Sequence, residues 1–87
     1  MNDKEQQNVS HYLYLPTKED AAEVATELRS QGFKTETRLS ADGENWLVLA
    51  HHRVVPSAEY IAGVRETMER LAERVHGEYD GWEVAVS

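Results

Sequence analysis

The sequence predicts an α+β fold: a ferredoxin-like βαββαβ sandwich, with a four-stranded antiparallel sheet and two helices on one face. Two stretches repeat apolar residues at helical spacing, and four others have strand patterns. These patterns follow one another in the order βαββαβ. One strand, residues 46–50, is an unbroken run of five apolar residues, which is typical of a strand buried on both faces.

The chain is expected to begin with a strand and a helix. Residues 9–15 alternate with a period of two until Pro16, which has no N–H to donate to a sheet. Thr17 can cap the helix that follows, and Gly32 can end it. The strand side expected to face the helices holds Val9, His11, Leu13 and Leu15. The apolar stripe of the helix holds Ala21, Val24, Ala25 and Leu28.

A hairpin is expected to join the second and third strands. The second strand pattern, residues 33–39, carries charges that are typical of an edge strand. Asp-Gly at 42–43, between two strand patterns, is a strong hairpin signal. On the third strand we expect the two leucines, Leu47 and Leu49, to face the helices. Trp46 and Val48 would then lie on the uncovered face.

The second half repeats the scheme. Ser57 can cap a helix that Gly77 ends. Its apolar stripe holds Ile61, Val64, Met68, Leu71 and Val75. Alternation along the last strand, 78–86, puts Trp82, Val84 and Val86 on one side and Tyr79, Gly81, Glu83 and Ala85 on the other.

Asp80-Gly81 interrupts this last strand. The pair predicts a turn or bulge that lets Tyr79 and Trp82 take positions that a regular strand would not allow. In one interpretation Trp82 packs in the core and Tyr79 covers the sheet. In the other, Glu78, Tyr79 and Asp80 form part of a docking surface.

Right-handed crossovers determine the expected strand order. They place the first and third strands side by side and parallel in the centre, with the second and fourth strands at the edges. The residues agree, because the first and third strands have the most apolar centres.

Composition limits the classes of function. The 87 residues suit a single domain at 8–87 after a flexible N-terminal tail at 1–7. The N-terminus lacks the apolar core of a signal peptide, and no apolar run approaches the roughly 20 residues that span a bilayer, so we expect a cytoplasmic protein and no membrane partner. The net charge of −7 disfavours nucleic acid as a partner and favours a basic protein surface. The alternative interpretation is that this charge only keeps a small protein soluble.

No reaction is predicted. His51 and His52 are adjacent on a strand, so their side chains point to opposite faces and cannot easily share a metal ion. There is no Gly-x-Ser-x-Gly nucleophile elbow, no P-loop and no dinucleotide fingerprint. We therefore expect no metal, no cofactor and no catalytic residues.

The sheet face without helices is the expected binding surface. By strand alternation it would present Tyr12, Tyr14, Trp46, Val48, Lys34, Arg38 and Tyr79. Aromatic and basic residues on a four-stranded sheet also suit single-stranded RNA binding, although the ribonucleoprotein consensus is absent. A small-ligand-binding module is a further alternative. Exposed aromatic patches on small proteins usually mark protein interfaces, which favours a protein partner.

The stretch Glu78-Tyr79-Asp80-Gly81-Trp82 resembles a signature near the C-terminus of the regulator of ribonuclease E activity B family, protein inhibitors of that endoribonuclease. Tyr12-Leu13-Tyr14, Gln31-Gly32-Phe33 and the run at 46–50 are similar in place and type, so the resemblance spans roughly residues 10 to 84. It implies a ferredoxin-like domain that binds the ribonuclease and lowers RNA cleavage without catalysis of its own. The residues we expect to bind the partner are Tyr12, Tyr14, Trp46, Glu78, Tyr79 and Asp80.

Overall fold

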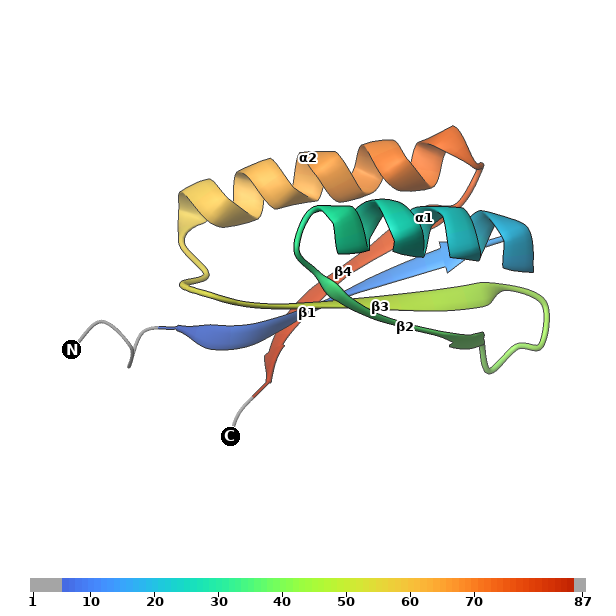
Figure 1. Ribbon diagram of the computed structural model, residues 1–87, viewed down its shortest axis with the longest axis horizontal. Coiled ribbons are helices and arrows are strands. Elements are labelled where there is room, and N and C mark those ends of the chain that lie inside the picture. Colours follow the sequence, from blue (N-terminus) through green and yellow to red (C-terminus); the bar gives the residue numbers. More distant parts are fainter. Residues whose placement is uncertain (1–5, 86–87) are drawn as a thin grey trace.

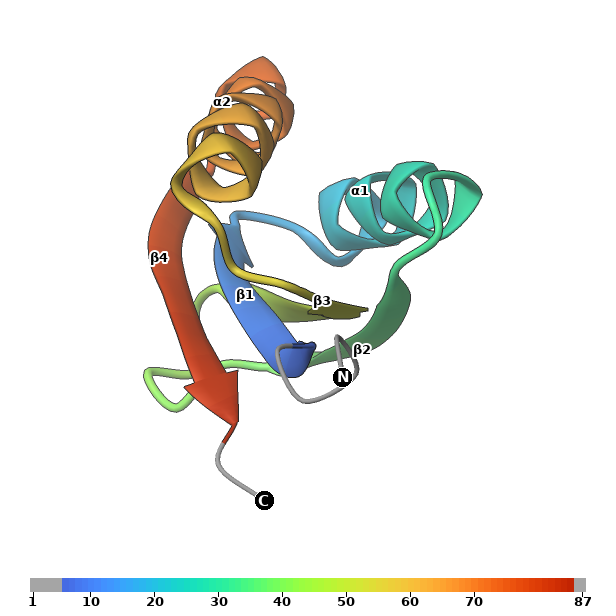
Figure 2. The ribbon, with the colours of Figure 1, turned by 90° about the vertical axis from the view of Figure 1, so that its left-hand side faces the viewer.

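The computed structural model describes residues 6–85 and has the predicted element order. The elements are β1 (Gln7–Leu15), α1 (Lys18–Ser30), β2 (Lys34–Leu39), β3 (Trp46–Val54), α2 (Ala58–Arg74) and β4 (Glu78–Ala85). Both helices lie on the same side of the sheet, as Figures 1 and 2 show, which confirms the predicted sandwich. Residues 1–5 of the expected tail and Val86 lie outside the described residues, and Gln7 already belongs to β1.

The strand order is β2-β3-β1-β4, with every neighbouring pair antiparallel. The expectation that β1 and β3 occupy the centre is confirmed, and the expectation that they are parallel is wrong. Each right-handed crossover skips one position, so the strand that fills the gap runs opposite to both strands that the crossover joins. α1 packs mainly over β2 and β3, and α2 over β4 and β1.

Both helices begin where the sequence predicts a cap. The Thr17 hydroxyl accepts from the Asp20 N–H at 3.0 Å, and the Ser57 hydroxyl accepts from the Tyr60 N–H at 3.1 Å. At the end of α2 it is His76 that takes a positive φ, of 61°. Gly77 serves a different purpose from the expected cap: a Cβ there would lie 2.5 Å from the Tyr14 carbonyl oxygen, so only glycine lets the chain pass this close to β1.

The core lies between the sheet and the helices. Leu13 and Leu15 are fully buried there, as the alternation of β1 predicts. Val48 and Ala50 join them from β3, and Trp46 packs against this core. The helix stripes add Ala21, Val24, Ala25, Leu28, Val64, Met68, Leu71 and Ala72.

The face assignment for β3 is therefore wrong, since Val48 and Trp46 face the helices. The register explains the inversion: Leu13 pairs with Val48 and Leu15 with Trp46, and residues directly opposite each other in an antiparallel pair share a face. An unbroken apolar run has no alternation, so the sequence carries no period that could assign its two faces.

Within residues 6–85, neither helix is long and apolar enough to cross a membrane.

Candidate functional site

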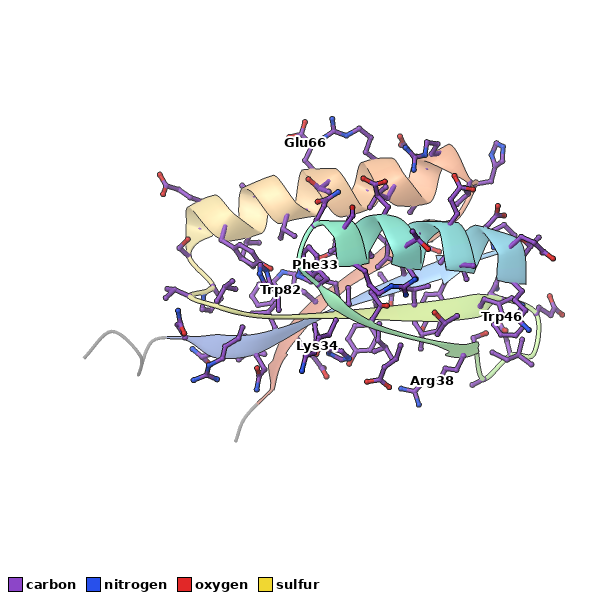
Figure 3. The ribbon with its side chains drawn as sticks, viewed as in Figure 1. Phe33, Lys34, Arg38, Trp46, Glu66 and Trp82 are labelled. Atoms are coloured by element: carbon purple, nitrogen blue, oxygen red, sulfur yellow. The ribbon has the colours of Figure 1, made fainter. Side chains whose placement is uncertain are left out.

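We call the side of the sheet away from the helices the open face. Its residues follow from the strand register: side chains directly opposite Tyr12 and Tyr14, and every second residue from these, share that side. They are Asn8, Ser10, Tyr12 and Tyr14 on β1; Leu47, Leu49, His51 and Arg53 on β3; Lys34, Glu36 and Arg38 on β2; and Glu78, Gly81 and Glu83 on β4. Figure 3 shows Lys34 and Arg38 on this side, away from the helices.

The two tyrosines of β1 lie on the open face as predicted, and both are half-buried. The Tyr12 hydroxyl donates to Glu83 Oε2 at 2.6 Å across β1 and β4, and this bond raises the Tyr12 pKa. Across β2 and β3, His51 Nε2 lies 3.0 Å from Glu36 Oε2. The face therefore has polar links near both edges, with Leu47 and Leu49 between them.

Trp46 is not on the open face, contrary to prediction. It lies on the helix side beside the start of α1, where Lys18 Nζ is 5.7 Å from the centre of the ring. Figure 3 shows Trp46 where β3 begins, below α1. Leu47, which was expected to face the helices, lies on the open face opposite Tyr14.

The predicted bulge in β4 is confirmed. Tyr12 pairs with Gly81 and Leu13 with Tyr79, which leaves Asp80 as the extra residue, and Gly81 has φ 111°. The bulge turns Tyr79 to the helix side, where it packs against the core, so its predicted place over the open sheet is wrong. Trp82 also lies on that side but is 39% exposed at the edge instead of packed in the core (Figure 3).

A histidine cluster that was not predicted lies buried under α2. His11 is fully buried, with Nδ1 2.9 Å from the Tyr79 hydroxyl and Nε2 3.2 Å from the Tyr60 hydroxyl. The Tyr60 hydroxyl also lies 3.4 Å from His52 Nδ1, and the Phe33 ring stands edge-on to His11. The position of His11 in the apolar alternation of β1 is the signal that could have found it.

Burial determines the protonation states in this cluster. Desolvation, and then the charges of His52 and His51, lower the His11 pKa to about 4, so His11 is neutral at pH 7. A neutral imidazole has one donor and one acceptor nitrogen, so one tyrosine donates to it and the other accepts. Burial also raises the Tyr79 pKa to about 12. The cluster is a satisfied structural network that ties α2 to β1 and β4.

An acidic hollow lies at one end of the open face. It has a volume of about 400 Å³ and is lined by Tyr14, Glu78 and Asp80 together with Ser40, Ala41, Asp42 and Asn45 of the β2–β3 hairpin. The Asp42 carboxylate accepts from the Ser40 hydroxyl and from the backbone N–H groups of Glu44 and Asn45. These bonds hold the Asp42 pKa well below its usual range.

The predicted partner-binding residues thus divide between two faces. Tyr12, Tyr14 and Glu78 share the open face, and Asp80 lines the hollow at its edge. Trp46 and Tyr79 belong to the helix side. In the part of the chain that the structure describes, no three His, Asp or Glu side chains come together as metal ligands would.

Comparison with curated proteins gives no significant match. The family model for the regulator of ribonuclease activity B (RraB) matches residues 2–84, nearly the whole chain. This agrees with the resemblance carried by the Glu78-Tyr79-Asp80-Gly81-Trp82 signature, whose bulge the structure contains. The chain belongs to the regulator of ribonuclease activity B family.

Proposed function

We propose that the chain binds a ribonuclease in the cytoplasm and lowers its cleavage of RNA, without catalysis of its own. The family match over residues 2–84 carries this proposal, because membership implies regulation of ribonuclease activity. The hydrogen bonds of the buried His11 also support a binding role. Both ring nitrogens of His11 are bound to tyrosine hydroxyls, so neither is available to move a proton on a substrate.

We propose Tyr12, Tyr14, Glu78 and Asp80 as the docking surface. The two tyrosines are half-buried and offer large contact areas with polar ends, as interface tyrosines do. Glu78 and Asp80 are exposed and line the acidic hollow beside Tyr14. In a chain of net charge −7, such a surface suits a basic patch on the ribonuclease.

Calorimetric titration against the host's ribonuclease E, paired with an RNA cleavage assay, tests this proposal. We expect saturable binding and slower cleavage. The double variant E78K/D80K should weaken binding about tenfold or more, since it puts like charges against a basic partner. Absence of binding at tens of micromolar would reject the proposal.

The variant E66K/E73K is the matched control. It makes the same change in net charge at two exposed positions of α2, and Figure 3 shows Glu66 pointing away from the sheet. We expect it to bind nearly as well as the wild type. Equal weakening by both variants would mean that overall charge, and not the proposed surface, governs binding.

Single-stranded RNA binding is not favoured by the open face. Trp46, one of the aromatic residues expected to stack bases, lies on the helix side. The β4 side of the open face carries Glu78 and Glu83, which repel a phosphate backbone.

A further inference from the structure

The open face separates its charges by strand. On β2 it presents Lys34 and Arg38, with Glu36 between them held by His51. On β4 it presents Glu78 and Glu83. Among residues 6–85, the ion pairs of the structure use none of Lys34, Arg38, Glu78 and Glu83. The face is therefore basic along one edge, acidic along the other, and carries tyrosine and leucine in the middle.

Three rows of these side chains cross all four strands from β2 to β4, and Arg53 lies beyond them, opposite Asn8. The first row holds Lys34, His51, Ser10 and Glu83. The second holds Glu36, Leu49, Tyr12 and Gly81. The third holds Arg38, Leu47, Tyr14 and Glu78.

We infer that the open face is an interface for a second copy of this chain, packed face to face about a two-fold axis. Let this axis lie midway between the two sheets and run parallel to the strands. Each row of one copy then packs over the same row of the other copy, and the strands of the second copy follow in the opposite order across the sheet. Because the order is β2-β3-β1-β4, β2 of one copy then faces β4 of the other, and β3 faces β1. Aligned packing of two sheets about 10 Å apart is a common arrangement.

Under this symmetry the charged edges complement each other. Arg38 faces Glu78 of the second copy, and Lys34 faces its Glu83; both contacts occur twice because the interface is isologous. Long arginine, lysine and glutamate side chains can bridge the gap between two sheets. Glu36 faces Gly81, which has no side chain, so the β4 bulge leaves no like charge opposite it.

The middle of the open face also suits a second copy. Leu47 faces Tyr14 of the second copy, and Leu49, already buried in the single chain, faces its Tyr12. The contact would remove the half-exposed surfaces of Leu47 and the two tyrosines from water. A partner surface that carries charge of only one sign does not match the whole open face, because one of the two edges would repel it. A second copy satisfies both edges.

The contact is expected to be weak and reversible. Four strands spaced about 4.8 Å apart make a small interface, and two chains of net charge −7 repel each other at long range. Salt near 0.15 M screens that repulsion beyond about 8 Å. The contact does not depend on a ribonuclease, but it uses Tyr14 and Glu78, so self-association and the proposed ribonuclease binding would exclude each other.

Sedimentation equilibrium of charge-swapped variants tests the inference without a ribonuclease. The wild type should shift from monomer toward dimer between about 10 µM and 1 mM at 0.15 M salt. K34E/R38E makes both edges acidic, and E78K/E83K makes both edges basic, so each alone should dimerise at least about tenfold more weakly. An equimolar mixture should dimerise again, because each acidic edge then meets a basic one.

The variant E66K/E73K on α2 controls for net charge and should dimerise at least as well as the wild type. A concentration series of amide NMR spectra provides a measurement that needs no variant: the amides of Leu47, Leu49, Tyr12 and Tyr14 should shift, and those of the outer surface of α2 should not. A wild type that stays monomeric to 1 mM overturns the inference. So does a dimer that the charge swaps leave unchanged, or a mixture that does not associate.

Discussion

At the scale of single residues, His11 is the most unusual feature of the chain. It occupies a position where strand alternation calls for an apolar side chain, and it is fully buried. An uncompensated polar group there would be costly, but two tyrosine hydroxyls from α2 and β4 satisfy both ring nitrogens. The hydrogen bonds make the position specific, because a differently aligned α2 or β4 would leave the imidazole unpaired.

The neutral state of His11 predicts a pH-dependent stability. Its pKa is about 4 in the folded chain and 6.5 in the unfolded reference, so between these values the unfolded chain binds more protons. This contribution is therefore fully present above about pH 6.5 and is lost as the pH falls toward 4, by up to about 3 kcal/mol. Urea unfolding of the wild type and of His11→Gln at pH 7.5, 5.5 and 4.5 measures it.

The difference between the two proteins isolates His11 from His51 and His52, which remain in both. We expect the free energy of unfolding of the wild type to fall more steeply with acidification than that of His11→Gln. Parallel curves would show that His11 is not held neutral by the fold.

At the scale of elements, the bulge in β4 decides which face each aromatic residue of the signature occupies. Tyr79 and Trp82 are three residues apart, so in a regular strand they would point to opposite sides. The extra residue Asp80 and the positive φ of Gly81 bring both to the helix side. Asp80 then remains at the edge of the acidic hollow, and Tyr79 reaches His11.

Alanine substitutions at two glycines test the strain at the bulge. Gly81→Ala should destabilise the fold by about 1–2 kcal/mol, because φ 111° is unfavourable for a residue with a Cβ even where space is open. Gly63→Ala, within α2 and equally uncrowded, should stabilise it by about 0.5–1 kcal/mol. Thermal and urea unfolding measure both, and effects of the same sign at the two sites would contradict this account of β4.

At the scale of the whole molecule, the two sides of the sheet have separate roles. The helix side contains the core and the histidine cluster, and Trp46 belongs to it. The open face combines the tyrosines and leucines of β1 and β3 with two charged edges. Both proposals, for a ribonuclease and for a second copy, place the partner on the open face.

Two aromatic substitutions distinguish these roles. Trp46→Ala should lower the free energy of unfolding by about 2 kcal/mol, since it removes a ring packed on the core, while the folded protein keeps its affinity for the ribonuclease. Tyr14→Ala should lower that affinity about tenfold or more with a smaller loss of stability. Calorimetric titration and urea unfolding of both variants measure this. A loss of affinity confined to Trp46→Ala would mean that the docking surface lies on the helix side.

The element order, the two N-terminal helix caps, the strand order and the bulge at Asp80-Gly81 could all be predicted from the sequence. The element order, the caps and the bulge each have a local signal: a period, a capping hydroxyl, or a glycine next to an acidic residue. The strand order follows from the right-handed crossovers between the strands. The helix-facing side of β1 was also predictable, because its apolar residues alternate with polar and aromatic ones.

Three features could not be predicted from the sequence: which side of β3 faces the helices, where Tyr79 lies, and which groups satisfy the ring nitrogens of His11. The run Trp46 to Ala50 has no alternation, so its faces depend on pairing with Leu13 and Leu15. The side on which Tyr79 lies depends on which β4 residue has no partner on β1. The hydrogen-bond partners of His11 are 49 and 68 residues away along the chain. A period is a local property of sequence, whereas register and long-range hydrogen bonds exist only once the strands and helices have met.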